Sequence, residues 1–152
     1  MHILNQILTP ERTVSHAHGP SKKRLFETIV KLVCANEPSL HYEEILDHLI
    51  TREKLGSTGL GGGIAIPHCR VGSCTQPLGA LLSLATPIPF DAPDDQPVDL
   101  LFVLLVPEEA CQQHLDILAN VAHLFSQQAF CRRLRAARDS HTLYKAACRD
   151  AE

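Results

Sequence analysis

Residues 100–106 read Leu-Leu-Phe-Val-Leu-Leu-Val, an unbroken run of apolar side chains. A strand with one face in water alternates apolar and polar residues, whereas a continuous run is typical of a strand buried on both faces of a helix-covered sheet. Segments with helical spacing of apolar residues lie on both sides of this run, at 21–36, 42–54, 109–127, 130–137 and 140–148. The run therefore predicts an α/β fold.

Three further strands are expected. Residues 64–66 (IAI) predict a strand that stops at Pro67, because proline cannot donate to a ladder. Residues 78–85 predict another strand, and Val14 is expected in an edge strand. Residues 86–97 form a proline-rich loop whose three acids are interpreted as solvated. This order of elements predicts a single-domain α/β sandwich, with a small mixed β-sheet flanked by helices on both faces.

Two of the expected helices carry more detailed predictions. Ser21 is a suitable N-cap for the helix over 21–36, and Gly56 is expected to terminate the helix over 42–54. In the helix over 109–127, helical spacing predicts four inward side chains: Leu115, Leu118, Ala122 and Phe125.

Composition limits the classes of protein that fit. The chain has 152 residues, of which 45% are hydrophobic and 20% charged, as expected for one folded domain. A net charge of −3 gives no reason to expect that the protein binds nucleic acid. Basic residues at 22–24 and 132–138 are interpreted as solvated helix faces, which could also contact an acidic protein partner. No apolar run is nearly long enough to span a membrane, and the N-terminus lacks the pattern of a secretory signal. The six cysteines contain no C-x-x-C pair. We therefore expect a soluble, cytoplasmic protein with free thiols.

The candidate chemistry gathers in residues 56–70 (GSTGLGGGIAIPHCR), around His68. The glycines precede the expected strand instead of following it, which excludes a dinucleotide fingerprint, and no Gly-Lys-Ser/Thr closes a phosphate-binding P-loop. We expect the imidazole of His68 at the end of the strand, with the small-residue loop beside it leaving room for a partner protein. Arg52, in the last turn of the preceding helix, would bring a guanidinium to this loop.

Three chemistries are open to His68. It could bind a metal together with Cys69, Cys74 and His114, although the spacing is loose. It could serve as the base for a cysteine nucleophile, either Cys69 or Cys111. It could also attack phosphorus itself and hold a phosphoryl group. Arg52 and His114 are the residues that could then stabilise the phosphoryl oxygens.

The chain resembles the type-2 enzyme IIA domains of the phosphoenolpyruvate-dependent phosphotransferase system over about residues 3–149. The resemblance rests on residues 51–54 (TREK), 56–59 (GSTG), 63–68 (GIAIPH), 90–92 (FDA), 97–107 and 113–115 (QHL). Residues 131–137 (CRRLRAA) are similar to the nitrogen-regulatory branch of this family.

The resemblance implies a phosphohistidine at His68, assisted by Arg52 and His114, with no cofactor and no metal. It implies a phosphoryl donor, the histidine-phosphocarrier protein of the nitrogen branch, and regulatory target proteins that distinguish the phosphorylated from the unphosphorylated form. The alternatives are a sugar-specific enzyme IIA that passes phosphate to a transporter IIB domain, and a binding module without transfer. Cys69 stands where the family usually has glycine, which predicts oxidation-sensitive phosphorylation. The sequence does not indicate an oligomeric state.

Overall fold

The computed structural model describes residues 3–109 and 111–148, with the side chain of Cys111 excepted. Strand β6 (Val98–Pro107) lies inside a six-stranded mixed sheet with the strand order β1-β5-β6-β3-β2, and β4 also pairs with β6. β5 (Leu78–Ile88) runs antiparallel to β6, whereas β3 and β4 run parallel to it. All of residues 100–106 are buried, which confirms the strand predicted from the apolar run.

The other elements complete one sandwich. They are α1 (Leu4–Ile7), the 3-10 helix η1 (Pro10–Arg12), β1 (Thr13–Ala17), α2 (Lys22–Ala35), α3 (Tyr42–Leu55), β2 (Gly59–Gly61), β3 (Ile64–Ala65), β4 (His68–Val71), α4 (Cys111–Phe125), α5 (Gln128–Ala136) and α6 (Ser140–Cys148). β1 forms the edge of the sheet, as expected from Val14, and the side chain of Ser21 accepts a hydrogen bond from the backbone N–H of Arg24 as the N-cap of α2.

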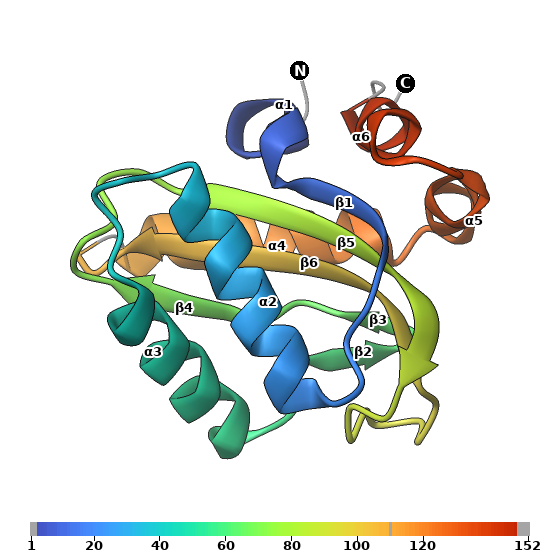
Figure 1. The fold of residues 1–152 in the computed structure, drawn as a ribbon, viewed down its shortest axis with the longest axis horizontal. Coiled ribbons are helices and arrows are strands. Elements are labelled where there is room, and N and C mark those ends of the chain that lie inside the picture. The colour runs from blue at the N-terminus through green and yellow to red at the C-terminus, as the bar shows by residue number, and fades with distance from the viewer. Residues whose placement is uncertain (1–2, 110, 149–152) are drawn as a thin grey trace.

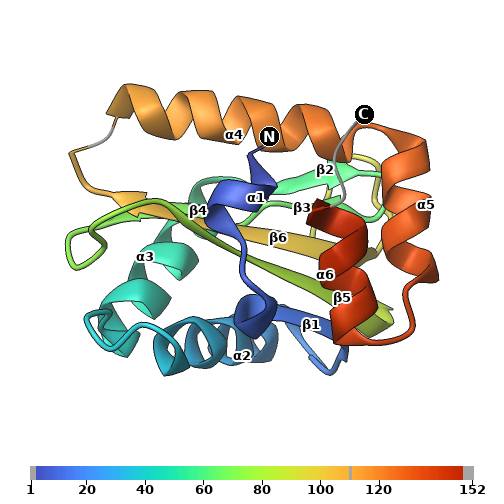
Figure 2. The same ribbon diagram turned by 90° about the horizontal axis from the view of Figure 1, so that it is seen from above.

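Helices cover both faces of the sheet, as predicted. Figures 1 and 2 show α2 and α3 on one side of the sheet and α4 on the other. Alternate side chains of β6 enter the two cores: Leu101, Val103 and Leu105 pack with α2 and α3. Leu100, Phe102, Leu104 and Val106 pack with α4, α5 and α6. The continuous apolar run thus reflects two buried faces.

β3 and β4 form one interrupted strand beside β6. Ala65 pairs with Leu101 and His68 pairs with Leu104, so the register is the same on both sides of the interruption. Pro67 has no N–H to donate, but its carbonyl still accepts a hydrogen bond from the Leu104 N–H at 2.9 Å. The predicted stop of the strand at Pro67 is therefore only a break, and His68 begins the next strand instead of following the last one.

One strand end and one side-chain position differ from the sequence prediction. β5 continues to Ile88 instead of ending near 85, with a register irregularity between Ser83 and Ile88. In α4 the predicted inward position of Leu115 is wrong, because its side chain is 59% exposed, whereas Ile117 and Val121 are buried. None of the helices in the described residues is long and apolar enough to cross a membrane.

Candidate functional site

A cleft of about 530 Å³ opens where α3, β4 and the start of α4 meet. The cleft contains Arg52, His68 and His114, which come from these three different elements. The structure thus brings together the three residues that the sequence singled out. The cleft also contains residues that sequence reasoning did not assign to it: Asp47, His48, Thr51, Leu55, Arg70 and Glu108.

The imidazole of His68 is fixed by the backbone beside it. Its Nδ1 lies 2.7 Å from the carbonyl oxygen of Ile66. A carbonyl oxygen can only accept a hydrogen bond, so Nδ1 carries the proton, and in the neutral ring Nε2 is left with the lone pair. The interruption of the strand at Ile66 and Pro67 supplies this carbonyl, because it falls outside both short strands. The local fold therefore selects one tautomer of His68.

Burial favours the neutral form of both histidines in the cleft. Burial has the largest effect on the pKa of His68 and lowers it. The hydrogen bond to Ile66 partly opposes this shift, and the positive charge of Arg52 lowers the pKa further. The pKa of His114 is lowered by burial and by the charges of His68, Arg70 and Arg52. A lowered pKa keeps the lone pair of Nε2 available near neutral pH.

His114 lies in the first turn of α4, close to His68. The two ring centroids are 5.5 Å apart with the ring planes at 64°, an edge-on arrangement. His114 is 9% exposed, and its Nδ1 is buried without a hydrogen-bond partner among the described residues. A buried polar atom without a partner is rare and calls for an explanation. An anion in the cleft would give the imidazole an acceptor.

Arg52 reaches the cleft from the last turn of α3. Its Nη1 donates a hydrogen bond to the carbonyl oxygen of Gly56 at 2.9 Å, just after the end of the helix. This contact fixes one side of the guanidinium and leaves donors for an anion, because arginine has five N–H groups. The cation also lies near the negative end of the α3 dipole, where positive charge is favoured.

Glu53, which sequence reasoning passed over, fixes the loop that follows α3. Its carboxylate accepts hydrogen bonds from the Thr58 backbone N–H at 3.0 Å and from Thr58 Oγ1 at 2.7 Å. It also pairs with Lys22 Nζ at 2.7 Å, with only 8% of its own side chain exposed. Ser57 Oγ donates to the carbonyl of Phe90 at 2.7 Å. These contacts hold residues 56–59 in place beside Arg52.

The glycine turn lies elsewhere than expected. Gly61, Gly62 and Gly63 have φ angles of 92°, 68° and 83°, and they form the turn between β2 and β3, at the end of β3 away from His68. They do not line the His68 cleft, so the prediction that this small-residue loop leaves room for a partner gains no support from these three glycines and stays a prediction. Asp94, one of the loop acids, accepts a hydrogen bond from the Gly62 N–H at 2.9 Å.

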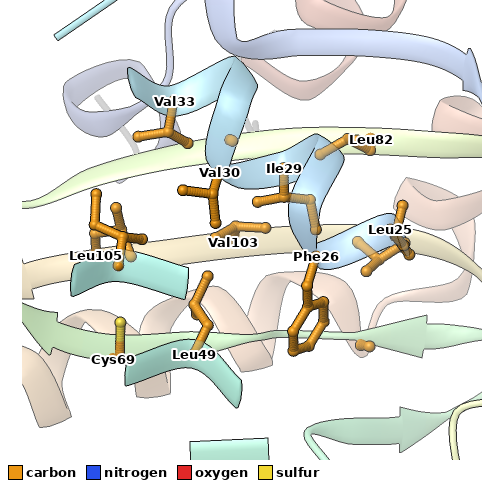
Figure 3. Close-up of a cluster of buried hydrophobic side chains, with 14 of the residues drawn as sticks. Leu25, Phe26, Ile29, Val30, Val33, Leu49, Cys69, Leu82, Val103 and Leu105 are labelled. Atoms are coloured by element: carbon orange, nitrogen blue, oxygen red, sulfur yellow. The ribbon is translucent and has the colours of Figure 1, made fainter. Parts of the chain in front are cut away.

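The alternative chemistries of His68 gain no support from the structure. The described residues contain no group of histidine, cysteine and acidic side chains that could hold a metal ion. Cys69 belongs to the lining of the cleft, but it is only 7% exposed and packs in the core beneath α2 and α3, where Figure 3 shows it near Leu49 and Leu105. Burial raises its pKa to about 12, so the thiol is a poor nucleophile, and the expected sensitivity to oxidation is not supported. The side chain of Cys111 lies outside the described parts of the chain.

The chain is similar to several nitrogen regulatory proteins. The chain is 49% identical over 142 residues to a nitrogen regulatory protein of Pseudomonas aeruginosa, an alignment that covers 93% of this chain and 92% of that protein. It is 46% identical over 143 residues to a nitrogen regulatory protein of Escherichia coli K12, covering 93% and 87% of the two chains. The crystal structure of nitrogen regulatory protein IIA-Ntr from Neisseria meningitidis matches with a TM-score of 0.86 and 39% identity over 95% of this chain and 98% of that one.

The family model "Phosphoenolpyruvate-dependent sugar phosphotransferase system, EIIA 2" matches residues 6–147. Because this match spans nearly the whole chain, the chain belongs to the type-2 enzyme IIA family of the phosphotransferase system.

Proposed function

We propose that this protein is a nitrogen-regulatory phosphocarrier that accepts a phosphoryl group on Nε2 of His68. The observation that carries the proposal is the hydrogen bond from His68 Nδ1 to the Ile66 carbonyl, which leaves Nε2 as the nucleophilic nitrogen in a cleft shared with Arg52 and His114. The cleft offers cations and histidine but no nucleotide-binding loop. The donor is therefore a phosphohistidine on a small carrier protein of the nitrogen branch, supplied from phosphoenolpyruvate.

The transfer needs no proton movement in this chain. The lone pair of Nε2 forms a bond to phosphorus while the bond from phosphorus to the donor's imidazole nitrogen breaks, and that nitrogen keeps the electron pair. The ring of His68 gains positive charge and retains its proton on Nδ1. The Ile66 carbonyl accepts a hydrogen bond from that N–H and so stabilises the charged ring.

Arg52 and His114 stabilise the phosphoryl oxygens. The guanidinium offers paired N–H donors whose geometry matches phosphate. His114 lies edge-on to His68, and the imidazole with an unpartnered buried nitrogen gains a partner when phosphate enters. Arg52 places positive charge, and both residues place hydrogen-bond donors, where charge is spread in the transition state.

The regulatory role rests on the relatives. The proteins of Pseudomonas aeruginosa and Escherichia coli that align along most of the chain both bear the name nitrogen regulatory protein. A phosphoryl group adds a charge of about −1.5 to −2 at one surface. Such a change at the cleft alters which target proteins bind there, so the phosphorylated and unphosphorylated forms regulate different targets.

The experiment is intact-mass analysis after incubation with phosphoenolpyruvate, the general phosphotransferase enzyme and a nitrogen-type carrier protein. We expect one acid-labile phosphoryl group on the unmodified protein and on His48→Ala, a matched control that removes another imidazole of the same cleft. His68→Ala should remain unlabelled although it folds. Arg52→Gln should be labelled about 100-fold more slowly. Equal labelling of His68→Ala would refute the proposal.

The family description refers to a sugar phosphotransferase system, which makes a sugar-specific enzyme IIA the second candidate. The two functions differ in the acceptor. Phosphorylated protein should keep its phosphoryl group when mixed with a purified fructose- or mannitol-type IIB domain. Rapid transfer to such a domain would replace the regulatory assignment by the sugar-specific one.

A further inference from the structure

A second hollow, of about 720 Å³, lies between α5 and α6. It contains three basic or titratable side chains, Arg133, His141 and Lys145, together with the hydroxyl-bearing Thr142 and Tyr144. No aspartate or glutamate lines it among the described residues. The rest of its wall is small and apolar, formed mainly by alanines. This groove has the lining of a site for a ligand that is both anionic and apolar.

The segment that forms the groove carries an excess of positive charge on an acidic chain. Residues 128–148 contain five arginines and lysines but a single acid, Asp139, whereas the whole chain has a net charge of −3. Of these cations, Arg135 is already neutralised by an ion pair with Asp99 at 2.8 Å. Asp139 accepts a hydrogen bond from the backbone N–H of Thr142 at the start of α6. The remaining positive charge of α5 and α6 is available to a partner.

Arg133 is held in place for such a partner. Its guanidinium carbon lies 5.5 Å from the centre of the Phe130 ring, a cation–π contact that orients the side chain. Its Nε is buried and has no hydrogen-bond partner among the described residues. Because this Nε is closed to solvent, a carboxylate would pair with the terminal N–H groups of the guanidinium.

The groove is separate from the His68 cleft. The two share no lining residue. Figures 1 and 2 both show α5 and α6 at the end of the molecule opposite α3, which carries Arg52. A protein bound at the groove therefore leaves the cleft open to a phosphoryl donor.

We propose that the groove between α5 and α6 is a docking surface for an acidic segment of a partner protein, with apolar side chains interspersed among the carboxylates. The carboxylates pair with Arg133 and Lys145, and the apolar side chains lie on the alanine-rich wall. A small inorganic anion would satisfy the cations but not the apolar wall. Nucleic acid fits less well, because the described part of the lining holds only two arginine or lysine side chains for a phosphate backbone, and its alanine-rich wall has no counterpart there.

The test is a titration of the ¹⁵N-labelled protein with a short peptide rich in glutamate and leucine, followed by amide chemical shifts. We expect shifts confined to α5 and α6, and no shifts with a matched peptide in which glutamine replaces glutamate. The double variant Arg133→Gln/Lys145→Gln should bind about tenfold more weakly, because two ion pairs are lost. The matched control Lys23→Gln/Lys31→Gln, which removes the same charge from the exposed side of α2, should bind like the unmodified protein.

Several results would overturn the proposal. One is equal weakening by both double variants, which indicates unspecific attraction. Another is a set of shifts centred on the His68 cleft, and a third is inorganic phosphate alone producing the same shifts at α5 and α6. A fourth is a groove covered by a second copy of the chain, detected by sedimentation as a dimer that the Arg133 and Lys145 substitutions dissociate. If the double variant loses its circular dichroism spectrum, the single variant Lys145→Gln at an exposed position replaces it.

Discussion

Replacing Glu53 with alanine tests whether the loop beside Arg52 depends on a buried carboxylate. The substitution removes the acceptor of two hydrogen bonds from Thr58 and the partner of Lys22. A hydrogen bond to a charged group contributes about 1.5–3 kcal/mol, so the two from Thr58 amount to about 3 kcal/mol at the lower end. The Lys22 side chain is 24% exposed, and its ion pair adds at most about 1 kcal/mol. We expect a loss of about 4 kcal/mol in the free energy of unfolding, which lowers Tm by about 10 °C.

The assay is urea unfolding followed by far-ultraviolet circular dichroism, because the chain contains no tryptophan for fluorescence. Glu53→Gln, which keeps one acceptor oxygen, should recover part of the loss. Glu27→Ala, at a partly exposed glutamate of α2, is the matched control. The folded Glu53→Ala protein should also accept the phosphoryl group more slowly, since residues 56–59 no longer hold Arg52 in position. If Glu53→Ala and Glu27→Ala differ by less than about 0.5 kcal/mol, the reasoning about this network is wrong.

Three other predictions follow from single residues. Because the pKa of His68 is lowered by folding, the unfolded chain binds a proton at a higher pH than the folded protein does. The stability due to His68 is therefore present above pH ~6.5 and is lost as the pH falls through the unfolded and then the folded pKa. NMR titration of the His68 ring should give a midpoint below pH ~6.5, and a midpoint above it contradicts the account. Cys69, with its pKa of about 12, should resist iodoacetamide at neutral pH in the folded protein and react in urea. Peptide mass mapping measures the labelling, and rapid labelling of Cys69 in the folded protein contradicts its burial. Gly79→Ala places a methyl group against the ring of Phe102 and should cost about 1–3 kcal/mol in urea unfolding. Gly56→Ala, where a methyl group meets nothing within 4 Å, should cost less, and equal losses would contradict the packing argument.

The layers of the fold follow from local sequence patterns. The continuous apolar run at 100–106 is read correctly because both faces of β6 are buried, and helical spacing locates α2 and α3 to within a few residues. The phase of α4 is harder to predict, since apolar residues occur at 115, 117, 118, 119, 121, 122, 124 and 125 and allow two overlapping stripes. The side chain of His114 faces the cleft, so that of the next residue, Leu115, faces outward. This choice depends on contacts between distant segments, which the spacing of apolar residues in the sequence does not reveal.

The site was predictable only in part for the same reason. His68 stands out by its position after Ile66 and Pro67, and both residue chemistry and the family resemblance point to Arg52 and His114 as its partners. Their meeting in one cleft depends on the pairing of β4 with β6 and on the approach of α4, which are contacts between distant segments. Glu53 went unnoticed because its partner Lys22 lies 31 residues earlier in the chain. The tautomer of His68 depends on the direction of one carbonyl group, which no residue pattern specifies.

The most direct test of the account is to locate the phosphoryl group on the ring of His68 by ¹H–¹⁵N correlation NMR of the phosphorylated, ¹⁵N-labelled protein. The hydrogen bond from Nδ1 to the Ile66 carbonyl predicts phosphorus bonded to Nε2, with Nδ1 still protonated. Phosphorus bonded to Nδ1, or to the ring of another histidine, would contradict the central claim that the break in the strand at Ile66 and Pro67 selects the nucleophilic nitrogen.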